Sequence, residues 1–195
     1  QTLYATHLQF HSYGGTNWKD FCSKSDEVTS YLNNRPQIVF DMGQVMFGKT
    51  TTMTADGPME FNLYRLHKNK WSNHDVELET GSGIIPVLYR RKNLVNSIMW
   101  SIGLELALLT KDPWQCMLTT DNPNGAPFVK YPEIIALLMS KKYRDLEFAR
   151  VHPKTESRVP LPSIERELDW YEITVRTRAA QAKALGILDL GKGHL

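Results

Sequence analysis

Three polar residues stand at or near the ends of short apolar runs, and their chemistry suits metal binding and the activation of water. His7 lies near the end of the first run, Asp41 directly follows the second, and Asp121 follows the third. A histidine and a carboxylate can hold a divalent cation, which lowers the pKa of bound water toward about 7, and the carboxylate can take the water proton. If the runs form neighbouring parallel strands, their carboxyl ends place these side chains on one rim.

The same residues also have structural interpretations. A histidine in a strand is more often a hydrogen-bonded core residue than a metal ligand, and His11 could either order the glycine loop that follows it or contact a ligand. We interpret Asp41, shortly before Gly43, as a turn carboxylate satisfied by backbone N–H groups. Asp121 precedes an Asn-Pro pair and could form a similar turn. The apolar run before Asp121 and the Pro/Gly loop after it favour a site, but pattern alone leaves both interpretations open.

Strands that alternate with helices would position these residues. Hydrophobic spacing predicts strands at residues 3–10, 37–44 and 114–120, a structured insertion at 47–83, and helices at 18–33, 95–109, 132–143 and 171–186. This alternation indicates an α/β fold built from parallel βα units. Because neither GxGxxG nor GxxxxGK[ST] is present, part of an α/β barrel fits at least as well as a doubly wound sheet.

Composition excludes several classes of protein. The chain has 195 residues and a formal net charge of +2, with scattered Lys and Arg residues, so we expect no nucleic-acid partner. No apolar run reaches the ~18 residues of a membrane-spanning helix, so we expect no membrane partner. Cys22 and Cys116 form neither a disulfide framework nor a CxxC motif, which indicates a reducing, cytoplasmic setting. The missing initiator Met and an end inside a predicted turn suggest an internal fragment.

Several segments spread along the chain resemble one family. Residues 119–128 (TTDNPNGAPF) and 6–15 (THLQFHSYGG) are similar to the A-subunit of formylmethanofuran dehydrogenase and to its counterpart in the methylotroph formyltransferase/hydrolase complex. Shorter similar segments are DMGQV at 41–45, TMTADGP at 52–58, ETGSG at 79–83, YRRKN at 89–93 and LPSI at 161–164. That family belongs to the amidohydrolase superfamily.

The resemblance implies a (β/α)8 TIM barrel with a small β-sandwich and a zinc centre, dinuclear in the full-length protein. Residues 1–186 would form about the sixth to eighth strands of an incomplete barrel, and residues 187–195 would begin the return to the β-sandwich. His7 would match a metal-binding histidine, and Asp121 would match the aspartate that binds metal and carries the proton. The further residues expected to contact the substrate are His11, Asn122 and Asn124.

The implied activity concerns the N-formyl group of formylmethanofuran, hydrolysed to formate or formed from it, with methanofuran as the one-carbon carrier. Other subunits of either complex would be the partners. The chain departs from the family at Asn122, because a histidine usually follows the catalytic aspartate. This departure leaves open a non-catalytic subunit that serves assembly or holds methanofuran. A separate alternative is a dihydroorotase- or hydantoinase-like enzyme that shares the site and acts on another amide.

Overall fold

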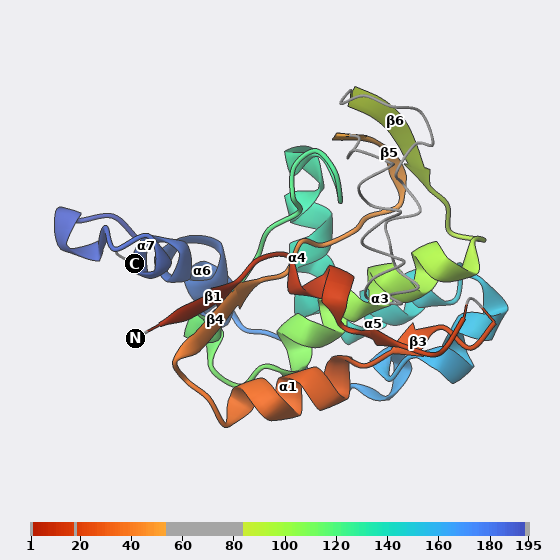
Figure 1. Cartoon of the computed structure of the whole chain (residues 1–195), viewed down its shortest axis with the longest axis horizontal. Coiled ribbons are helices and arrows are strands. Elements are labelled where there is room, and N and C mark those ends of the chain that lie inside the picture. Colours follow the sequence, from red (N-terminus) through yellow and green to blue (C-terminus); the bar gives the residue numbers. More distant parts are fainter. Residues whose placement is uncertain (1, 18, 54–83, 194–195) are drawn as a thin grey trace.

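The computed structural model of the chain describes residues 2–17, 19–53 and 84–193 (Figure 1). Most of the predicted insertion, residues 54–83, lies outside the described residues, together with the similar segment at 79–83 and most of the one at 52–58. Figure 1 shows β1 and β4 side by side, α3 crossing the middle of the molecule, and β5 and β6 projecting from one end. None of the helices in the described ranges is long and apolar enough to cross a membrane.

A three-stranded parallel sheet positions the polar residues at the strand ends. β1 (Leu3–Ala5) pairs with β4 (Ile38–Asp41), which pairs in turn with β7 (Cys116–Met117), in the order β1-β4-β7. Because neighbouring strands run in the same direction, His7, Asp41 and Asp121 follow the same edge of the sheet, as predicted.

The two faces of this sheet are buried by different partners. Phe40 and Cys116, which lie opposite each other in the register, belong to the main hydrophobic core. The alternate residues Val39 and Met117 point to the other face, where they pack with Val175 and Ala180. Burial on both faces explains why these strands read as continuous apolar runs rather than as alternating patterns.

All three strands are shorter than predicted, and the second, expected at 37–44, extends only over Ile38–Asp41. β1 ends at Ala5 because His7 takes a left-handed conformation, with φ 48° and ψ 52°, and residues 8–11 continue as the 3-10 helix η1 (Leu8–His11). The third predicted strand begins with the 3-10 helix η2 (Pro113–Gln115), whose start is capped by the Asp112 side chain, so that only Cys116–Met117 pairs.

The predicted helix at 18–33 is wrong in its first half. β2 (Tyr13–Gly14) pairs antiparallel with β3 (Cys22–Ser23), and helix α1 extends only over Ser25–Asn33. The Asp20 carboxylate accepts hydrogen bonds from the backbone N–H groups of Thr16 and Asn17, at 2.7 and 2.6 Å. These bonds close a turn where the apolar spacing suggested a helix.

The prediction of the central helix is correct. α3 spans Leu94–Leu109, and the Asn93 side chain caps its start by accepting from the backbone N–H of Asn96. Most of its residues are buried, and it packs against α1, α4 and η1. The described part of the predicted insertion contains the strand β5 (Gly48–Met53), which pairs antiparallel with β6 (Ile84–Tyr89).

The C-terminal helices are more interrupted than predicted. Ser140 separates α4 (Tyr131–Met139) from α5 (Lys141–Phe148) and caps α5 through its side chain, so a single helix at 132–143 is wrong. The predicted helix at 171–186 consists of α6 (Trp170–Thr174), the π-helical η6 (Val175–Ala179) and α7 (Ala180–Ala184). The short 3-10 helices of this half are η3 (Phe128–Lys130), η4 (Pro153–Arg158), η5 (Leu161–Ser163) and η7 (Leu188–Leu190).

Candidate metal and catalytic site

His7 and Asp121 meet in space after leaving their strands in the same unusual backbone conformation. Their φ angles are 48° and 49°, and among the described residues they are the non-glycine residues with positive φ. This left-handed region is uncommon outside glycine, and strained residues of this kind concentrate at functional sites. The Nε2 atom of His7 lies 3.2 Å from Oδ1 of Asp121. The structure therefore brings together the two residues for which the sequence predicts metal binding.

The His7 imidazole lies between two carboxylates of different exposure. Its Nδ1 is 2.5 Å from Oδ1 of Asp41, whose side chain is 1% exposed, whereas the side chains of His7 and Asp121 are 32% and 33% exposed. Asp41 thus holds the ring from the protein interior, and Asp121 approaches it from the accessible side. This arrangement leaves Nε2 as the ring nitrogen that faces the candidate site.

Asp41 is not the turn carboxylate that its sequence context suggested. It accepts one backbone hydrogen bond, from His7 N at 3.0 Å, but also side-chain bonds from the Tyr4 hydroxyl at 2.6 Å and the Thr119 hydroxyl at 2.5 Å. Burial acts to raise the pKa of Asp41, yet the hydrogen bonds from Thr119, Tyr4 and His7 together hold that pKa below its usual value. An ionised Asp41 can only accept, so Nδ1 of His7 carries a proton.

Sequence reasoning missed this role, although a signal was present. Asp41 directly follows the apolar run Ile38–Phe40, the same pattern that drew attention to Asp121. What distinguishes the two is burial: Asp41 is enclosed by the side chains of Tyr4 and Thr119, whereas Asp121 stays partly accessible.

The three further residues expected at the site are placed differently from one another. Asn124 donates from Nδ2 to Oδ2 of Asp121 at 2.8 Å and so fixes the second carboxylate oxygen. Asn122 is exposed, and its Oδ1 accepts from the backbone N–H of Phe128 at 3.0 Å, which closes the loop after the strand. His11 is exposed at the end of η1, where its imidazole forms no hydrogen bond with another described residue. Of the three, only Asn124 contacts Asp121 through its side chain.

The pair of His7 and Asp121 fits two ligands of a zinc ion. Two ligands that share a tetrahedral zinc at about 2.1 Å lie roughly 3.4 Å apart, close to the observed 3.2 Å between Nε2 and Oδ1. Metal-binding histidines also commonly donate their other ring N–H to a carboxylate, as His7 does to Asp41. Within residues 2–17, 19–53 and 84–193, no group of three or more His, Cys, Asp or Glu side chains could hold a metal ion alone.

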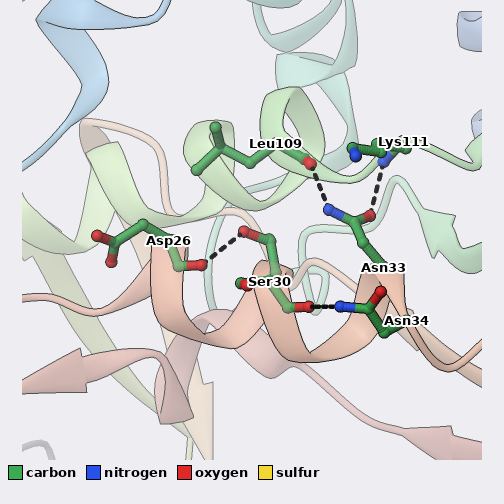
Figure 2. A pocket seen from close by; sticks show the side chains of 7 residues that line it. Asp26, Ser30, Asn33, Asn34, Leu109 and Lys111 are labelled. Atoms are coloured by element: carbon green, nitrogen blue, oxygen red, sulfur yellow. Dashed lines mark hydrogen bonds between the residues drawn. The ribbon is translucent and has the colours of Figure 1, made fainter.

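Two surface pockets lie elsewhere and do not include His7 or Asp121 among their lining residues. One, of about 340 Å³, lies between α1 and the end of α3 (Figure 2). There, Asn33 donates to the Leu109 carbonyl at 3.0 Å and accepts from Lys111 N at 2.9 Å, so its amide ties the two helix ends together. The other, of about 620 Å³, lies beside α5 and η4 and is lined in part by Lys92, Lys141 and His152.

Comparisons with known proteins show which family the chain matches. Residues 1–195 match the model of the amidohydrolase family. The chain is 52% identical over 195 residues to Protein FwdA of Methanocaldococcus jannaschii, and 39% identical over 201 residues to the Fhc A-subunit of the formyltransferase/hydrolase complex of Methylorubrum extorquens. These matches include 100% and 99% of the chain but 34% and 36% of the relatives, so the chain spans about a third of their length.

A solved structure is also similar. The crystal structure of the formyltransferase/hydrolase complex FhcABCD from Methylorubrum extorquens, in complex with methylofuran, contains a chain that matches with a TM-score of 0.82 and 37% sequence identity. The match covers 100% of this chain and 36% of that one.

Proposed function

This chain belongs to the amidohydrolase family, and from that premise we propose that it is part of the A-subunit of a formylmethanofuran-handling complex. The reaction is the hydrolysis of the N-formyl amide of formylmethanofuran to formate and the free amine, or the reverse condensation. The observation that carries the proposal is the approach of His7 Nε2 to Asp121 Oδ1 at 3.2 Å, with the other ring nitrogen held by Asp41.

The proposed architecture extends beyond the described sheet. We assign β1, β4 and β7 to about the sixth to eighth strands of an amidohydrolase barrel, and residues 187–195 to the return toward a β-sandwich. The parallel order β1-β4-β7 and the likeness to the formyltransferase/hydrolase structure support this assignment. The partners proposed for the whole protein are the other subunits of such a complex, because the relatives include the Fhc A-subunit.

His7 and Asp121 would hold a zinc ion together with ligands outside this pair. When bound, zinc would supply Lewis-acid chemistry, polarising the formyl carbonyl and lowering the pKa of a water molecule; the full-length protein would hold two such ions. Asp41 keeps the proton on Nδ1 of His7 and so reserves Nε2 for the metal. The chain's own residues therefore fit the ligand chemistry that the family implies.

Asp121 would move the proton during the reaction. Its Oδ2 is fixed by Asn124, and its Oδ1 faces His7, so the carboxylate is oriented before substrate arrives. In hydrolysis, Asp121 takes the proton of the attacking water as the O–C bond to the formyl carbon forms. It then gives that proton to the amine nitrogen as the C–N bond breaks. The products are formate and the amine, and condensation runs through the same steps in reverse.

The position of Asn122 bears on the non-catalytic alternative. Its side-chain oxygen accepts from Phe128 N and does not contact Asp121, so an asparagine here leaves the His7–Asp121 pair in place. A histidine at this position could itself take part in proton transfer, so the non-catalytic alternative, a subunit that serves assembly or holds methanofuran, is decided by the activity of the Asp121→Asn variant.

The test uses the full-length protein in its complex. We expect Asp121→Asn to lower formylmethanofuran hydrolysis by about 10²–10⁴-fold, because a general base is lost. His7→Ala should lower both the rate of hydrolysis and the amount of zinc bound per protein. The exposed Asp189 serves as a matched control, and Asp189→Asn should change neither quantity. Unchanged hydrolysis by Asp121→Asn would overturn the catalytic proposal, and a preference for cyclic amides over formylmethanofuran would favour the dihydroorotase-like alternative.

A further inference from the structure

A buried stretch, Met42–Met46, lies between the turns that carry His7 and Asp121; we call it the central segment. On one side, the backbone N–H of Gln9, in η1, donates to the Met42 carbonyl at 3.2 Å. On the other side, Gln44 N donates to the Thr119 carbonyl at 2.8 Å, and Met46 N donates to the Gly125 carbonyl at 3.0 Å. The position of this segment therefore sets how far apart the two turns lie.

Gly43 gives the segment its closest approach to His7. A Cβ at position 43 would lie 2.9 Å from the Cβ of His7, and the backbone has φ +68°, which favours glycine. The N–H of Gly43 donates to the Thr119 hydroxyl at 2.9 Å, and that hydroxyl donates to Asp41. The segment thus touches His7 directly and also reaches the carboxylate that orients its ring.

Two fully buried amides attach the central segment to its surroundings. Gln9, two residues after His7, accepts from Val45 N through Oε1 at 3.1 Å. Gln44 donates through Nε2 to the carbonyls of Trp100, in α3, at 3.0 Å and of Val45 at 2.7 Å. Gln9 therefore links the His7 turn to the segment, and Gln44 links the segment to the central helix.

Gly103 in the middle of α3 makes room for both amides. A Cβ at position 103 would lie 2.2 Å from Oε1 of Gln9 and 2.2 Å from Oε1 of Gln44. Glycine in a helix interior costs about 1 kcal/mol relative to alanine, so this glycine needs a packing reason, and the two amides supply one. The buried Gln9 Nε2 and Gln44 Oε1 lack a hydrogen-bond partner among the described residues.

We propose that Gln9 and Gln44, packed over Gly103, are positioning residues that set the distance between His7 Nε2 and Asp121 Oδ1. They act through the central segment and touch neither site residue's reacting atoms. This inference rests on the proposed function where it is tested by kcat. The His7–Asp121 distance in a crystal structure tests it independently of that function. A displacement of about 1 Å in such a site can cost on the order of 10²-fold in rate.

The experiment compares two variants of the full-length protein with a control in the same helix. Gln44→Met keeps the side-chain length but removes the amide, and Gly103→Ala introduces the methyl group that collides with both oxygens. Ile98→Val, at another buried position of α3, removes one methyl group away from the amides. For each variant we would measure three properties. These are the zinc affinity, kcat and KM for formylmethanofuran, and the His7–Asp121 distance in a crystal structure.

We expect both test variants to weaken zinc binding by about 10–100-fold, as loss of supporting contacts around a metal site does. They should lower kcat with KM changed by less than about threefold, and they should alter the His7–Asp121 distance. Ile98→Val should lower only the melting temperature. If Gly103→Ala fails to fold, the Gln44→Met variant alone still tests the positioning role.

Zinc affinity and a His7–Asp121 distance that match those of Ile98→Val would overturn the positioning role. The proposed function would be left standing by that result, since it depends on Asp121→Asn. Conversely, an active Asp121→Asn variant would remove the catalytic readout, and the crystallographic distance would then decide the positioning role by itself.

Discussion

Asp41 Oδ1 lies 2.5 Å from His7 Nδ1, so the buried carboxylate, and not the accessible Asp121, fixes which ring nitrogen faces the site. The three donors that surround Asp41 keep it ionised, and an ionised carboxylate can only accept from the imidazole. On the proposed function, the ring nitrogen that His7 offers to a metal is therefore decided from inside the protein.

Replacing this carboxylate by an amide should impair metal binding. Asp41→Asn keeps the volume of the side chain but brings an NH₂ group among the donors of Tyr4, Thr119 and His7. We expect zinc affinity of the full-length protein to fall by about 10–100-fold, measured by titration and by metal analysis. Tyr4→Phe removes one donor and leaves the His7–Asp41 contact, so it should cost less than about tenfold. Equal zinc affinity in Asp41→Asn and the wild type would contradict this role of Asp41.

Asn124 should act on kcat rather than on substrate binding. Its Nδ2 holds Oδ2 of Asp121, so Asn124→Ala frees the carboxylate to rotate, and we expect kcat to fall by about tenfold, which corresponds to the roughly 1.4 kcal/mol of one hydrogen bond. Asn34→Ala is the matched control, because Asn34 is exposed at the end of α1 and its amide donates to the Ser30 carbonyl, away from the site. Steady-state kinetics separate the two, and a rise in KM alone for Asn124→Ala would instead support the substrate contact expected from sequence.

Glu105 should make stability depend on pH near neutrality. This buried residue of α3 accepts from the hydroxyls of Ser23 and Ser25, at 2.5 and 2.6 Å, and from Leu161 N at 3.1 Å. Burial raises its pKa from 4.5 to about 7 in spite of these bonds. A carboxyl whose folded pKa is raised favours the folded state below its unfolded pKa of 4.5, and that contribution is lost as pH rises through about 7.

Glu105→Gln should remove this dependence. The amide can accept from Leu161 N and donate to a serine hydroxyl, so the packing is kept. Relative to the wild type, the variant should gain about 3 kcal/mol between pH 4.5 and about 7, seen as a rising difference in melting temperature. The exposed Glu156→Gln provides the control. A difference that stays constant across this pH range would show that Glu105 does not titrate there.

Arg144 should be a major contributor to stability. Its guanidinium is buried and donates to the carbonyls of Leu137, Ile164 and Arg166, at 2.8 to 3.0 Å, which joins the end of α4 to the segment after η5. Arg144→Met would leave these carbonyls without their donor, and we expect a loss of about 3 kcal/mol, measured by denaturant unfolding. Lys142→Met, at an exposed neighbouring position, should stay within about 0.5 kcal/mol. Similar losses for both variants would contradict the assignment.

The meeting of His7 and Asp121 could be anticipated from sequence. For Asp41, the sequence indicated its place at a strand end but not its role as the carboxylate that orients His7. Parallel strands share one polarity, so residues after neighbouring strands converge without any knowledge of side-chain packing. An aspartate before Met-Gly looks the same whether it closes a turn or orients a histidine. The donors that decide between these roles, Tyr4 and Thr119, lie 37 and 78 residues away along the chain, and sequence spacing does not reveal such contacts.

In the secondary structure, too, some elements could be predicted from the sequence and others could not. The prediction of α3 is accurate to within one residue because its apolar spacing is long and its start is capped by Asn93. The helix predicted at 132–143 breaks at Ser140, because serine is tolerated in a helix interior but favoured at a helix start, and here it caps α5. The prediction of one helix at 171–186 missed the π-helical turn at Val175–Ala179, a rare form that occurs mostly as a single turn inside α-helices.

The left-handed backbone at His7 and Asp121 also limits which metals this rim can be re-engineered to accept. Asn, Asp and His are the side chains that tolerate φ angles of 48° and 49° most readily, and two of these three supply good metal ligands. A cysteine, which would favour softer ions, would add a backbone cost of about 1–2 kcal/mol at either position. If the proposed metal site is correct, conversion to a thiolate-ligated centre would therefore require rebuilding both turns, whereas exchange among metals that accept imidazole and carboxylate would leave the backbone of both turns unchanged.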